Sequence, residues 1–499
     1  MLALVFVVGM LLRSAPWAFN RSLWVDEARL ALNILGRPAG ALLQPLDDRQ
    51  VAPVGFLLLE KLAVQLFGEG ERALRLVPLV AGIASMGLFY ALARRWLSSA
   101  EALFALALFA LCPPLVYYSS EVKQYSTDVL VALALLWAGE RSAERTARTR
   151  DWLALVLAGA AGVWISHPAA FVCAGVGLAL GLRAWRQGEI RDAYRYAAVS
   201  ATWAASFLVS YWLVLRRADP GGYLLQFWAD GFPPVPPRSL ADLLWPARTF
   251  IAFFNDPAGL RFAGLAAAAF TMGVLRWLAA APRIVALLVM PAVFTLLASL
   301  LGRYPFPTSV AHGSFPVQGR LILFLVPPAL ILIAAGVGWL FRPGRPVPVR
   351  ALGAVAAIAL LVPPALDAAG RFPRGFRIHD VRPLVEEIGR PGQDGDVVVI
   401  NARARPLWRY YARRLEASRP LLAGFDPVEL GGTNRWAVYD AQLRALPKGA
   451  RVWLLYAHHP TWRTDKDEAF VVHVLDALGE QGEVKRAPGA SLRLYRLGG

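Results

Sequence analysis

The chain has 499 residues, of which 57% are hydrophobic and only 17% are charged. A soluble domain carries about 25% charged residues, and here the apolar residues come in the long uninterrupted runs that cross membranes. The sequence therefore predicts a polytopic membrane protein. The net charge of +17 does not indicate a nucleic-acid partner, because the cations are spread over short loops between the apolar runs.

In chain order, we expect about eleven membrane-spanning helices. The first apolar run lacks a charged segment before it and a clear cleavage site after it, so we interpret it as a retained span and not as a signal peptide. Cys112 and Cys173 lie in apolar runs, which argues against a disulfide framework. The predicted spans lie near 1–17, 73–97, 99–117, 125–140, 151–166, 168–186, 193–215, 259–278, 283–301, 320–341 and 350–368.

Arginines are distributed unevenly between alternate loops. With a cytoplasmic N-terminus, the cytoplasmic loops hold almost all of them, whereas the short opposite loops hold only Lys123 and Arg303. The positive-inside rule then places residues 18–72, 216–258 and everything after about 370 outside the cytoplasm. The cytoplasmic cations are Arg94, Arg95, Arg141, Arg145, Arg148, Arg150, Arg183, Arg186, Arg191, Arg195, Arg276, Arg283, Arg342, Arg345 and Arg350.

The composition changes after the last span, which predicts a membrane domain at 1–369 and an extracytoplasmic domain at 370–499. The second part contains short β-branched runs bounded by Gly and Asp, with helix-like stretches between them, as in a small α/β domain. His458 and His459 are adjacent, so in a strand they would point to opposite faces, which argues against a shared metal ion. No internal repeat is visible, which counts against a transporter built of inverted halves.

The first outer loop contains "SLWVDEARLALNIL" and then "VGFLLLEKLAVQLFG". Both stretches have apolar residues at helical spacing and few charges, which predicts helices lying in the membrane interface. Such a helix would hold Asp26 and Glu27 at the depth of the lipid head groups. Equally, the two acids can face water and favour a helix N-terminus.

The second outer loop, "CPPLVYYSSEVKQYSTD", follows a Pro-Pro pair that ends a span. If a helix begins here, Glu121, Tyr125 and Asp128 share one face. This density of donors and acceptors favours a binding site. The alternative is an ordinary polar helix end with an aromatic belt of tyrosines. The polar residues in question are Glu121, Lys123, Gln124, Tyr125 and Asp128.

Two further outer turns carry polar residues at the membrane surface. His167 stands in the short turn "SHP", where a structural role is the commoner one. Arg303 and Tyr304 end one span, and Arg320 begins the next. Since the positive-inside rule disfavours cations here, an anionic lipid phosphate is a natural ligand for them. The alternative is snorkelling to ordinary head groups.

At these residues the chain resembles the bacterial relatives of protein O-mannosyltransferases and aminoarabinose transferases, which are GT-C type membrane glycosyltransferases. The matching pieces cover most of residues 1–341. They are "LWVDEA", "APVGFLLLEKLAVQLFG" followed by "ALRLVPLVAG", "YYSSEVKQYSTD", "SHPAAF" and "RYPF…GRLILFLVPPALILIAAG". The resemblance implies the GT-C fold in the bacterial cytoplasmic membrane, with the active site and the C-terminal domain outside the cytoplasm.

By this resemblance, Asp26 takes the position of the catalytic acid in the first outer loop. Glu121 is favoured over Asp128 as the second acid, and Arg320 helps to bind the lipid phosphate. One departure concerns the Lys-Pro-Pro motif of the aminoarabinose branch, because the sequence here is "DRQVAP" with Val51 at the Lys position. Arg49 is a candidate substitute, and transfer of aminoarabinose to lipid A is disfavoured.

The implied donor is a sugar on polyprenyl phosphate, so the leaving group needs charge stabilisation from Arg320, Arg303 or Lys123. Gln124, Tyr125, His167 and Tyr304 are the other candidate binding residues. Asp26 is the expected base for an acceptor hydroxyl, in an inverting in-line displacement. Alternatively Asp26, Glu27 and Glu121 hold a divalent metal, Mg²⁺ or Mn²⁺, through oxygen ligands.

The expected partners are the lipid-linked donor, membrane lipids and an acceptor that is a protein, a lipid or a glycan. Another class stays open, a lipid or glycan transporter, because many spans with intramembrane charges fit it too. Against a transporter, the polar residues gather on one face and do not line a path through the centre. A sensor or scaffold would leave the acids of the first loop unexplained.

Overall fold

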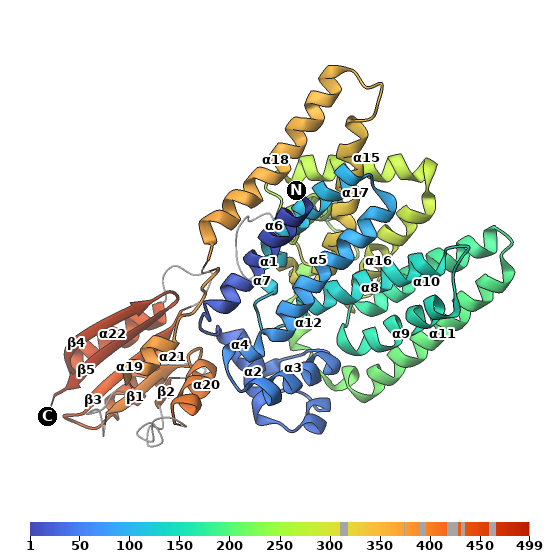
Figure 1. Ribbon diagram of the computed structural model, residues 1–499. Helices are drawn as coiled ribbons and strands as arrows, with labels where there is room; N and C mark the ends of the chain where they lie inside the picture. Colours follow the sequence, from blue (N-terminus) through green and yellow to red (C-terminus); the bar gives the residue numbers. More distant parts are fainter. Residues whose placement is uncertain are drawn as a thin grey trace. The chain divides into compact units, whose positions relative to one another are not determined.

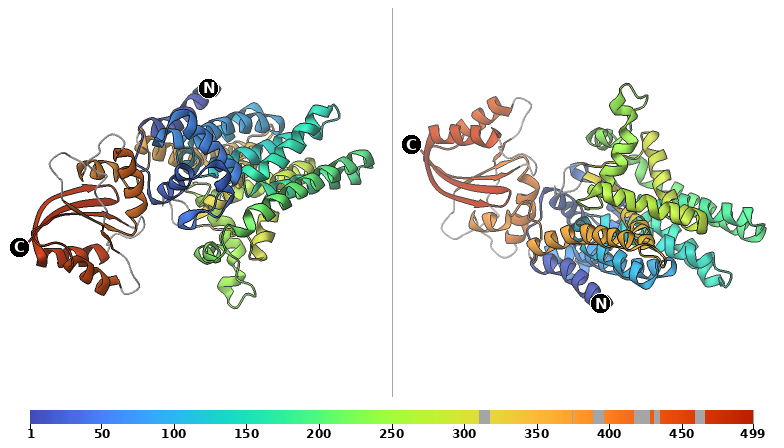
Figure 2. Two further views of the ribbon diagram at one scale, coloured as in Figure 1. Left: turned by 90° about the horizontal axis from the view of Figure 1, so that it is seen from below. Right: turned by 90° about the horizontal axis from the view of Figure 1, so that it is seen from above.

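The computed structural model describes residues 1–499 except 310–317, 374, 389–395, 417–427, 431–434, 459–465 and 499. Figures 1 and 2 show a mostly helical chain with one sheet near the C-terminus. The chain forms two compact units, Met1–Phe19 with Arg37–Gly375 and Asn20–Gly36 with Phe376–Gly499. The sequence placed a boundary at 369/370, and the structure in addition groups residues 20–36 with the C-terminal residues.

Each predicted span overlaps a helix of the first unit. The span predicted at 99–117 ends in a separate short helix, Pro113–Tyr118, and the one predicted at 320–341 begins in a 3₁₀ segment, Gln318–Leu325. Among the described residues, seven helical segments are long and apolar enough to cross a membrane, and the number of spans stays a prediction. Both cysteines are buried and unbridged. The helices are α1 (Leu2–Ala18), α5 (Leu76–Trp96), α6 (Ser99–Leu111), α8 (Tyr125–Ser142), α9 (Thr149–Ile165), α10 (Ala169–Arg186), α11 (Ile190–Leu213), α15 (Ala263–Ala280), α16 (Pro282–Leu300), α17 (Val326–Leu340) and α18 (Val347–Arg371).

Helix α17 is the most enclosed of these segments and packs closely on α15. Gly273 of α15 and Gly336 of α17 allow this approach, because a Cβ atom on either would collide with the backbone of the other helix. Small residues at a crossing are the usual way for membrane helices to pack, since lipid offers no hydrophobic driving force between them. This pair forms the centre of the first unit.

Short helices fill the loops predicted to lie outside the cytoplasm. Those of the first unit are α3 (Val54–Phe67), α4 (Glu71–Leu74), α7 (Pro113–Tyr118), α12 (Tyr223–Phe227), α13 (Leu240–Leu243), α14 (Trp245–Asn255) and the 3₁₀ segments η1 (Ala39–Leu43), η2 (Asp47–Arg49), η3 (Leu215–Arg217), η4 (Ala229–Gly231) and η5 (Gln318–Leu325). The two helices predicted in the first outer loop are present as α2 (Val25–Gly36) and α3. Their position in the membrane interface stays a prediction.

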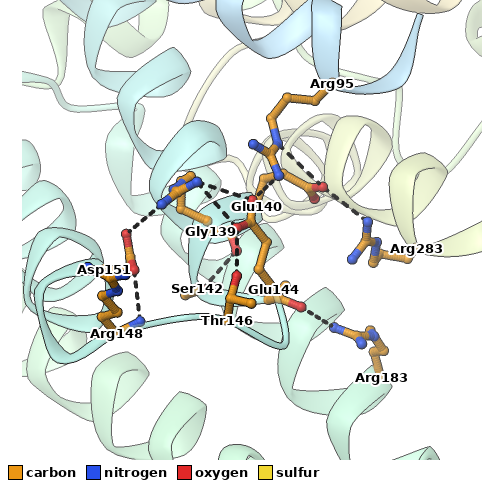
Figure 3. A network of polar contacts seen from close by, with 12 residues as sticks. Arg95, Gly139, Glu140, Ser142, Glu144, Thr146, Arg148, Asp151, Arg183 and Arg283 are labelled. Carbon is orange, nitrogen blue, oxygen red and sulfur yellow. Dashed lines mark hydrogen bonds and ion pairs between the residues drawn. The ribbon is translucent and has the colours of Figure 1, made fainter.

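Three of the loops predicted to be cytoplasmic, those near 95, 141–151 and 283, meet in one ion-pair network, which Figure 3 shows. Glu140 of α8 accepts from Arg283 Nη2 at 3.0 Å, and its neighbour Glu144 pairs with Arg95. Arg141 reaches Asp151 at the start of α9 at 3.4 Å. Loops that the charge pattern assigned to one side of the membrane are therefore joined in space.

The second unit contains an α/β domain, as predicted. Its sheet has the strand order β2-β1-β3-β5-β4, in which β1, β2 and β3 run parallel and β5 is antiparallel to β3 and β4. Helices α21 and α22 pack on the sheet through buried apolar residues, and α2 packs against α20. The elements are β1 (Val397–Asn401), β2 (Val428–Leu430), β3 (Arg451–Ala457), β4 (Gly479–Ala487), β5 (Ala490–Leu497), α19 (Arg382–Ile388), α20 (Arg405–Glu416), α21 (Arg435–Arg444) and α22 (Lys466–Leu478).

Candidate functional site

The loop between α7 and α8, together with the first turn of α8, is rich in polar side chains and buried. Every residue from Ser119 to Asp128 is buried, including Glu121 and Lys123, which are 1% and 6% exposed. Burying a charge is costly unless hydrogen bonds compensate it. Lys123 Nζ donates to Gln50 Oε1 at 2.7 Å, so the first and second predicted outer loops meet here. A merely solvated helix end would leave these side chains in water.

Tyrosines form the wall of this loop and are buried, unlike a belt at a membrane surface. The Tyr118 ring lies 4.9 Å from that of Tyr117 and 4.7 Å from that of Tyr125. Burial raises the pKa of Tyr118, the charge of Glu121 raises it further, and the charge of Arg320 opposes the rise. Glu121 and Arg320 thus both act on one phenol.

Asp128 extends the cluster towards the turn before α10. Its carboxylate faces Ser166 and acts electrostatically on Tyr304. Burial first, and then the charges of Asp128 and Tyr125, raise the pKa of Tyr304, whose hydroxyl donates to Leu321 O at 2.8 Å. Four loops distant in sequence therefore converge around the start of α8.

His167 follows Ser166 in the same turn. Burial lowers the pKa of its imidazole to about 4, so the ring is neutral near pH 7. A neutral imidazole offers one donor and one acceptor and no charge for a phosphate. Its position suits a polar contact with an uncharged ligand group.

Asp256 fixes the segment that carries Arg320. Its Oδ2 accepts the N–H of Gln318 and its Oδ1 accepts that of Gly319, both at 2.9 Å. Burial raises the pKa of Asp256 to about 6, against the opposing effect of these two hydrogen bonds and of Arg320. The Arg320 guanidinium carbon lies 4.5 Å from the centre of the Trp228 ring.

The remaining predicted cations lie at the surface. Arg49 is exposed, and its guanidinium carbon lies 4.2 Å from the Tyr223 ring centre. Arg303 is exposed at the end of α16, and within the described part of the chain its guanidinium makes no hydrogen bond or ion pair. The structure thus brings Glu121, Lys123 and Arg320 together with Tyr304 and leaves Arg303 outside these contacts.

The predicted acids of the first loop belong to the second unit. Glu27 is fully buried, pairs with Arg21 Nη1 at 2.9 Å and accepts the N–H of Trp24 at 3.3 Å. Asp26 is partly exposed in the first turn of α2. The two adjacent acids therefore lie in different environments, and the ion pair with Arg21 gives Glu27 a structural role.

The turn before α2 is attached to residues from the far end of the sequence. Tyr411 OH accepts the N–H of Leu23 at 2.7 Å, and His379 Nδ1 accepts that of Val25 at 3.4 Å. Ser22 donates to Asp380. The C-terminal domain therefore holds the helix that bears Asp26.

The alternative of a metal site has no ready set of ligands. Within the described ranges, no three His, Cys, Asp or Glu side chains are grouped as a bound ion requires. Asp26 and Glu121 belong to different units. His458 Nδ1 lies 3.4 Å from Glu468 Oε2, and His459 lies outside the described residues.

Sequence reasoning missed several residues of this site. Gln50, Tyr223, Trp228 and Asp256 were not singled out, although "FNDPAG" around Asp256 is a polar turn between apolar runs. Trp228 lies in a long loop of mixed composition that gave no clear signal. His379 and Tyr411 were missed because nothing local in the sequence connects them with residues 20–36.

Comparison with known proteins agrees with this architecture. The family model of dolichyl-phosphate-mannose-protein mannosyltransferase matches residues 50–212, about a third of the chain, and this range contains Glu121, Lys123 and His167. A search among curated proteins finds no match.

Solved structures share the fold over nearly the whole chain. ArnT from Cupriavidus metallidurans bound to undecaprenyl phosphate is 13% identical, with a TM-score of 0.56 over 99% of this chain and 96% of that one. Its apo state matches with a TM-score of 0.55. The Archaeoglobus fulgidus oligosaccharyltransferase in complex with Zn and sulfate is 14% identical, with a TM-score of 0.55 over 100% and 73% of the two chains.

These likenesses confirm the fold that the resemblance implied. The chain is a multi-pass membrane protein with the GT-C fold of these transferases and a C-terminal α/β domain.

Proposed function

We propose that the chain is a glycosyltransferase that moves a sugar from a polyprenyl-phosphate donor to an acceptor hydroxyl at the outer face of the cytoplasmic membrane. The observation that carries this proposal is the buried polar loop 119–128, which meets Gln50, Tyr304 and Arg320 at one place in the first unit. A buried group of charged side chains is costly, so it indicates a functional site where structural ion pairs, such as those of Glu27 and Glu140, do not account for it. ArnT, which has the same fold, is seen bound to undecaprenyl phosphate.

Arg320 and Lys123 are assigned to the donor phosphate. Arg320 offers a planar fork of N–H donors that matches phosphate oxygens, and Lys123 adds a compact charge. Both are held by neighbours, Arg320 by Trp228 and Lys123 by Gln50. Donors held in place before the reaction stabilise a leaving phosphate best where water is scarce. Arg49, whose guanidinium lies over the Tyr223 ring, is assigned to the same phosphate from the exposed rim of the site. Arg303, which is also exposed, is assigned to the rim alone.

Asp26 is assigned as the base. The acceptor oxygen attacks the anomeric carbon while its proton passes to the Asp26 carboxylate. The bond from that carbon to the phosphate oxygen breaks, and its electron pair leaves with polyprenyl phosphate. Glu27 is excluded from this task because Arg21 and Trp24 already use its carboxylate. A single displacement inverts the sugar carbon.

Glu121 is assigned to the sugar. It lies next to Tyr118, whose phenol also feels the charge of Arg320, so an acidic group stands close to the proposed phosphate ligand. Carboxylates accept hydrogen bonds from sugar hydroxyls. The proposed acceptor is a protein, a lipid or a glycan.

The test is mass spectrometry of envelope glycans and polyprenyl-phosphate lipids in matched strains. These are a deletion and the deletion carrying wild type, Asp26→Asn or Asp47→Asn at equal expression. Asp47 is the matched control, because it is an acid of the same loop whose side chain is 75% exposed. One sugar should vanish from one acceptor in the deletion and return with wild type and with Asp47→Asn.

The Asp26→Asn strain should stay without the sugar and accumulate the charged donor lipid. If Asp26→Asn restores the product, Asp26 is not the base. If the deletion changes the sidedness of a lipid or glycan without changing any linkage, the alternative transporter function replaces this proposal.

A further inference from the structure

Two arginines with the same proposed ligand rest on one short segment. Arg49 comes from the first predicted outer loop and Arg320 from η5, yet their aromatic partners, Tyr223 and Trp228, are five positions apart. Tyr223 begins α12, and Trp228 stands between α12 and η4. The two cation–ring distances are 4.2 Å and 4.5 Å. Both fall within the range in which a guanidinium is attracted to a ring face.

We propose that Tyr223 and Trp228 are positioning residues that hold Arg49 and Arg320 for the phosphate of a membrane-anchored polyprenyl chain. This inference rests on the function proposed above and names residues of the donor site that no resemblance assigns.

The geometry of a guanidinium explains why a ring is a suitable support. The ring takes one face of the planar group, while the N–H bonds point outward from its edge. A stacked arginine therefore keeps the donor fork that matches two phosphate oxygens, and it loses less freedom when the phosphate binds. A carboxylate partner would instead compete with the phosphate for the same N–H groups.

The segment is itself fixed at both ends. Asp219 caps α12, accepting the N–H of Tyr223 at 3.1 Å and that of Leu224 at 2.8 Å. Gly222 before it has φ +64°, a conformation that favours glycine. At the other end, Gly231 O accepts the N–H of Phe306 at 2.7 Å, which ties η4 to the loop after Tyr304. The backbone of this segment therefore fixes the positions of the Tyr223 and Trp228 rings.

The same segment also exposes apolar side chains. Leu225 is 44% and Phe227 is 58% exposed, beside the aromatic residues that hold the cations. A ligand with a phosphate head and a hydrocarbon tail can use both surfaces, whereas free phosphate uses only the cations. These neighbours therefore favour a lipid phosphate as the ligand.

The test is binding of undecaprenyl phosphate to the full chain in lipid nanodiscs, followed by native mass spectrometry with inorganic phosphate as competitor. Trp228→Leu and Tyr223→Leu should each weaken binding by about tenfold. Trp228→Phe and Tyr223→Phe should stay close to wild type, because each keeps a ring face.

Trp339→Leu is the matched control, since it also removes a stack, the one that Arg345 makes 3.7 Å from the Trp339 ring. It should bind as wild type does. Equal thermal unfolding of all the variants separates positioning from misfolding.

The proposal is overturned if the leucine variants bind as wild type does, or if the phenylalanine variants are as weak as the leucine ones. Inorganic phosphate that competes as effectively, mole for mole, as added undecaprenyl phosphate would also overturn it, because the tail would then contribute nothing. If wild type itself binds no undecaprenyl phosphate, the proposed function fails before the positioning role is reached.

Discussion

Asp256 holds the backbone of Gly319, with 2.9 Å between the carboxylate Oδ1 and the amide nitrogen. The approach is so close that a Cβ atom on Gly319 would lie 2.6 Å from Pro257 Cδ and 2.8 Å from that same carboxylate oxygen. The next residue is Arg320. The direction of this arginine is therefore set by a backbone turn that only glycine fits.

We expect Gly319→Ala to impair donor binding more than it impairs folding. The added methyl must push Pro257 or Asp256 away, which breaks the N–H bond and moves Arg320. Undecaprenyl phosphate binding should fall at least about tenfold, as the loss of a charge-assisted contact implies. Gly302→Ala is not a suitable control because its φ is +65°, whereas Gly264→Ala is, since its Cβ would meet open space. Equal binding by Gly319→Ala would contradict this reasoning.

Asp256 should also make the free energy of unfolding of the chain depend on pH. Its pKa is about 6 in the folded chain against an ordinary value of 3.8, so the fold favours the protonated carboxyl. The contribution of Asp256 to the stability of the fold is therefore fully present below about pH 4, and it is lost as the pH rises through 6. The difference of about 2 in pKa corresponds to about 3 kcal/mol.

The measurement is the free energy of unfolding of wild type and Asp256→Asn from pH 4 to pH 8. Comparing the two cancels the other titrating groups. The stability of wild type relative to Asp256→Asn should decrease up to about pH 7 and then stay level. A relative stability that increases with pH would reverse the assigned direction.

Substitutions at the two adjacent acids of the first loop should have different effects, one on stability and the other on activity. Glu27→Gln leaves the buried Arg21 without its charge partner and should destabilise the second unit by about 3–5 kcal/mol. Asp26→Asn, in a partly exposed position, should leave thermal unfolding almost unchanged while abolishing transfer. Thermal unfolding and transfer are measured on the same preparations. Equal destabilisation by both substitutions would show that Asp26 is structural as well.

The network in Figure 3 should contribute to stability and not to donor binding. Glu140→Ala removes a buried carboxylate whose partners Arg283 and Arg95 have side chains 32% and 26% exposed, so the first unit should lose about 1–2 kcal/mol of stability. Its affinity for undecaprenyl phosphate should not change, because the network joins the loops at 95, 140–151 and 283 and none of the residues around Arg320. Weaker donor binding at full stability would instead show coupling between these regions.

Most of the fold could be predicted because lipid imposes a strong constraint on sequence. Apolar runs located α1, α5, α6, α8, α9, α10, α11, α15, α16, α17 and α18, each of which overlaps a predicted span. The ends of the helices were predicted less accurately. The span predicted at 99–117 divides into α6 and α7, because Pro113 and Pro114 begin a new helix.

The candidate site was predictable only where polar residues interrupt apolar sequence. Glu121, Lys123 and Arg320 gave that signal, and the structure brings them into one region. Trp228 and Asp256 gave none, because an aromatic residue or an acid in a long loop is ordinary. The burial of Glu27 was also hidden, since its partner Arg21 is only one of many arginines in the chain.

The attachment of residues 20–36 to the C-terminal domain has a consequence for biosynthesis. Val25 and its partner His379 are separated by 354 residues, which a ribosome needs roughly 20 to 70 s to add. Throughout that interval the nascent chain has the helix of the proposed base but not the residues that hold it. Assembly of this part of the protein must wait for the end of translation, so a chain that terminates early never acquires it.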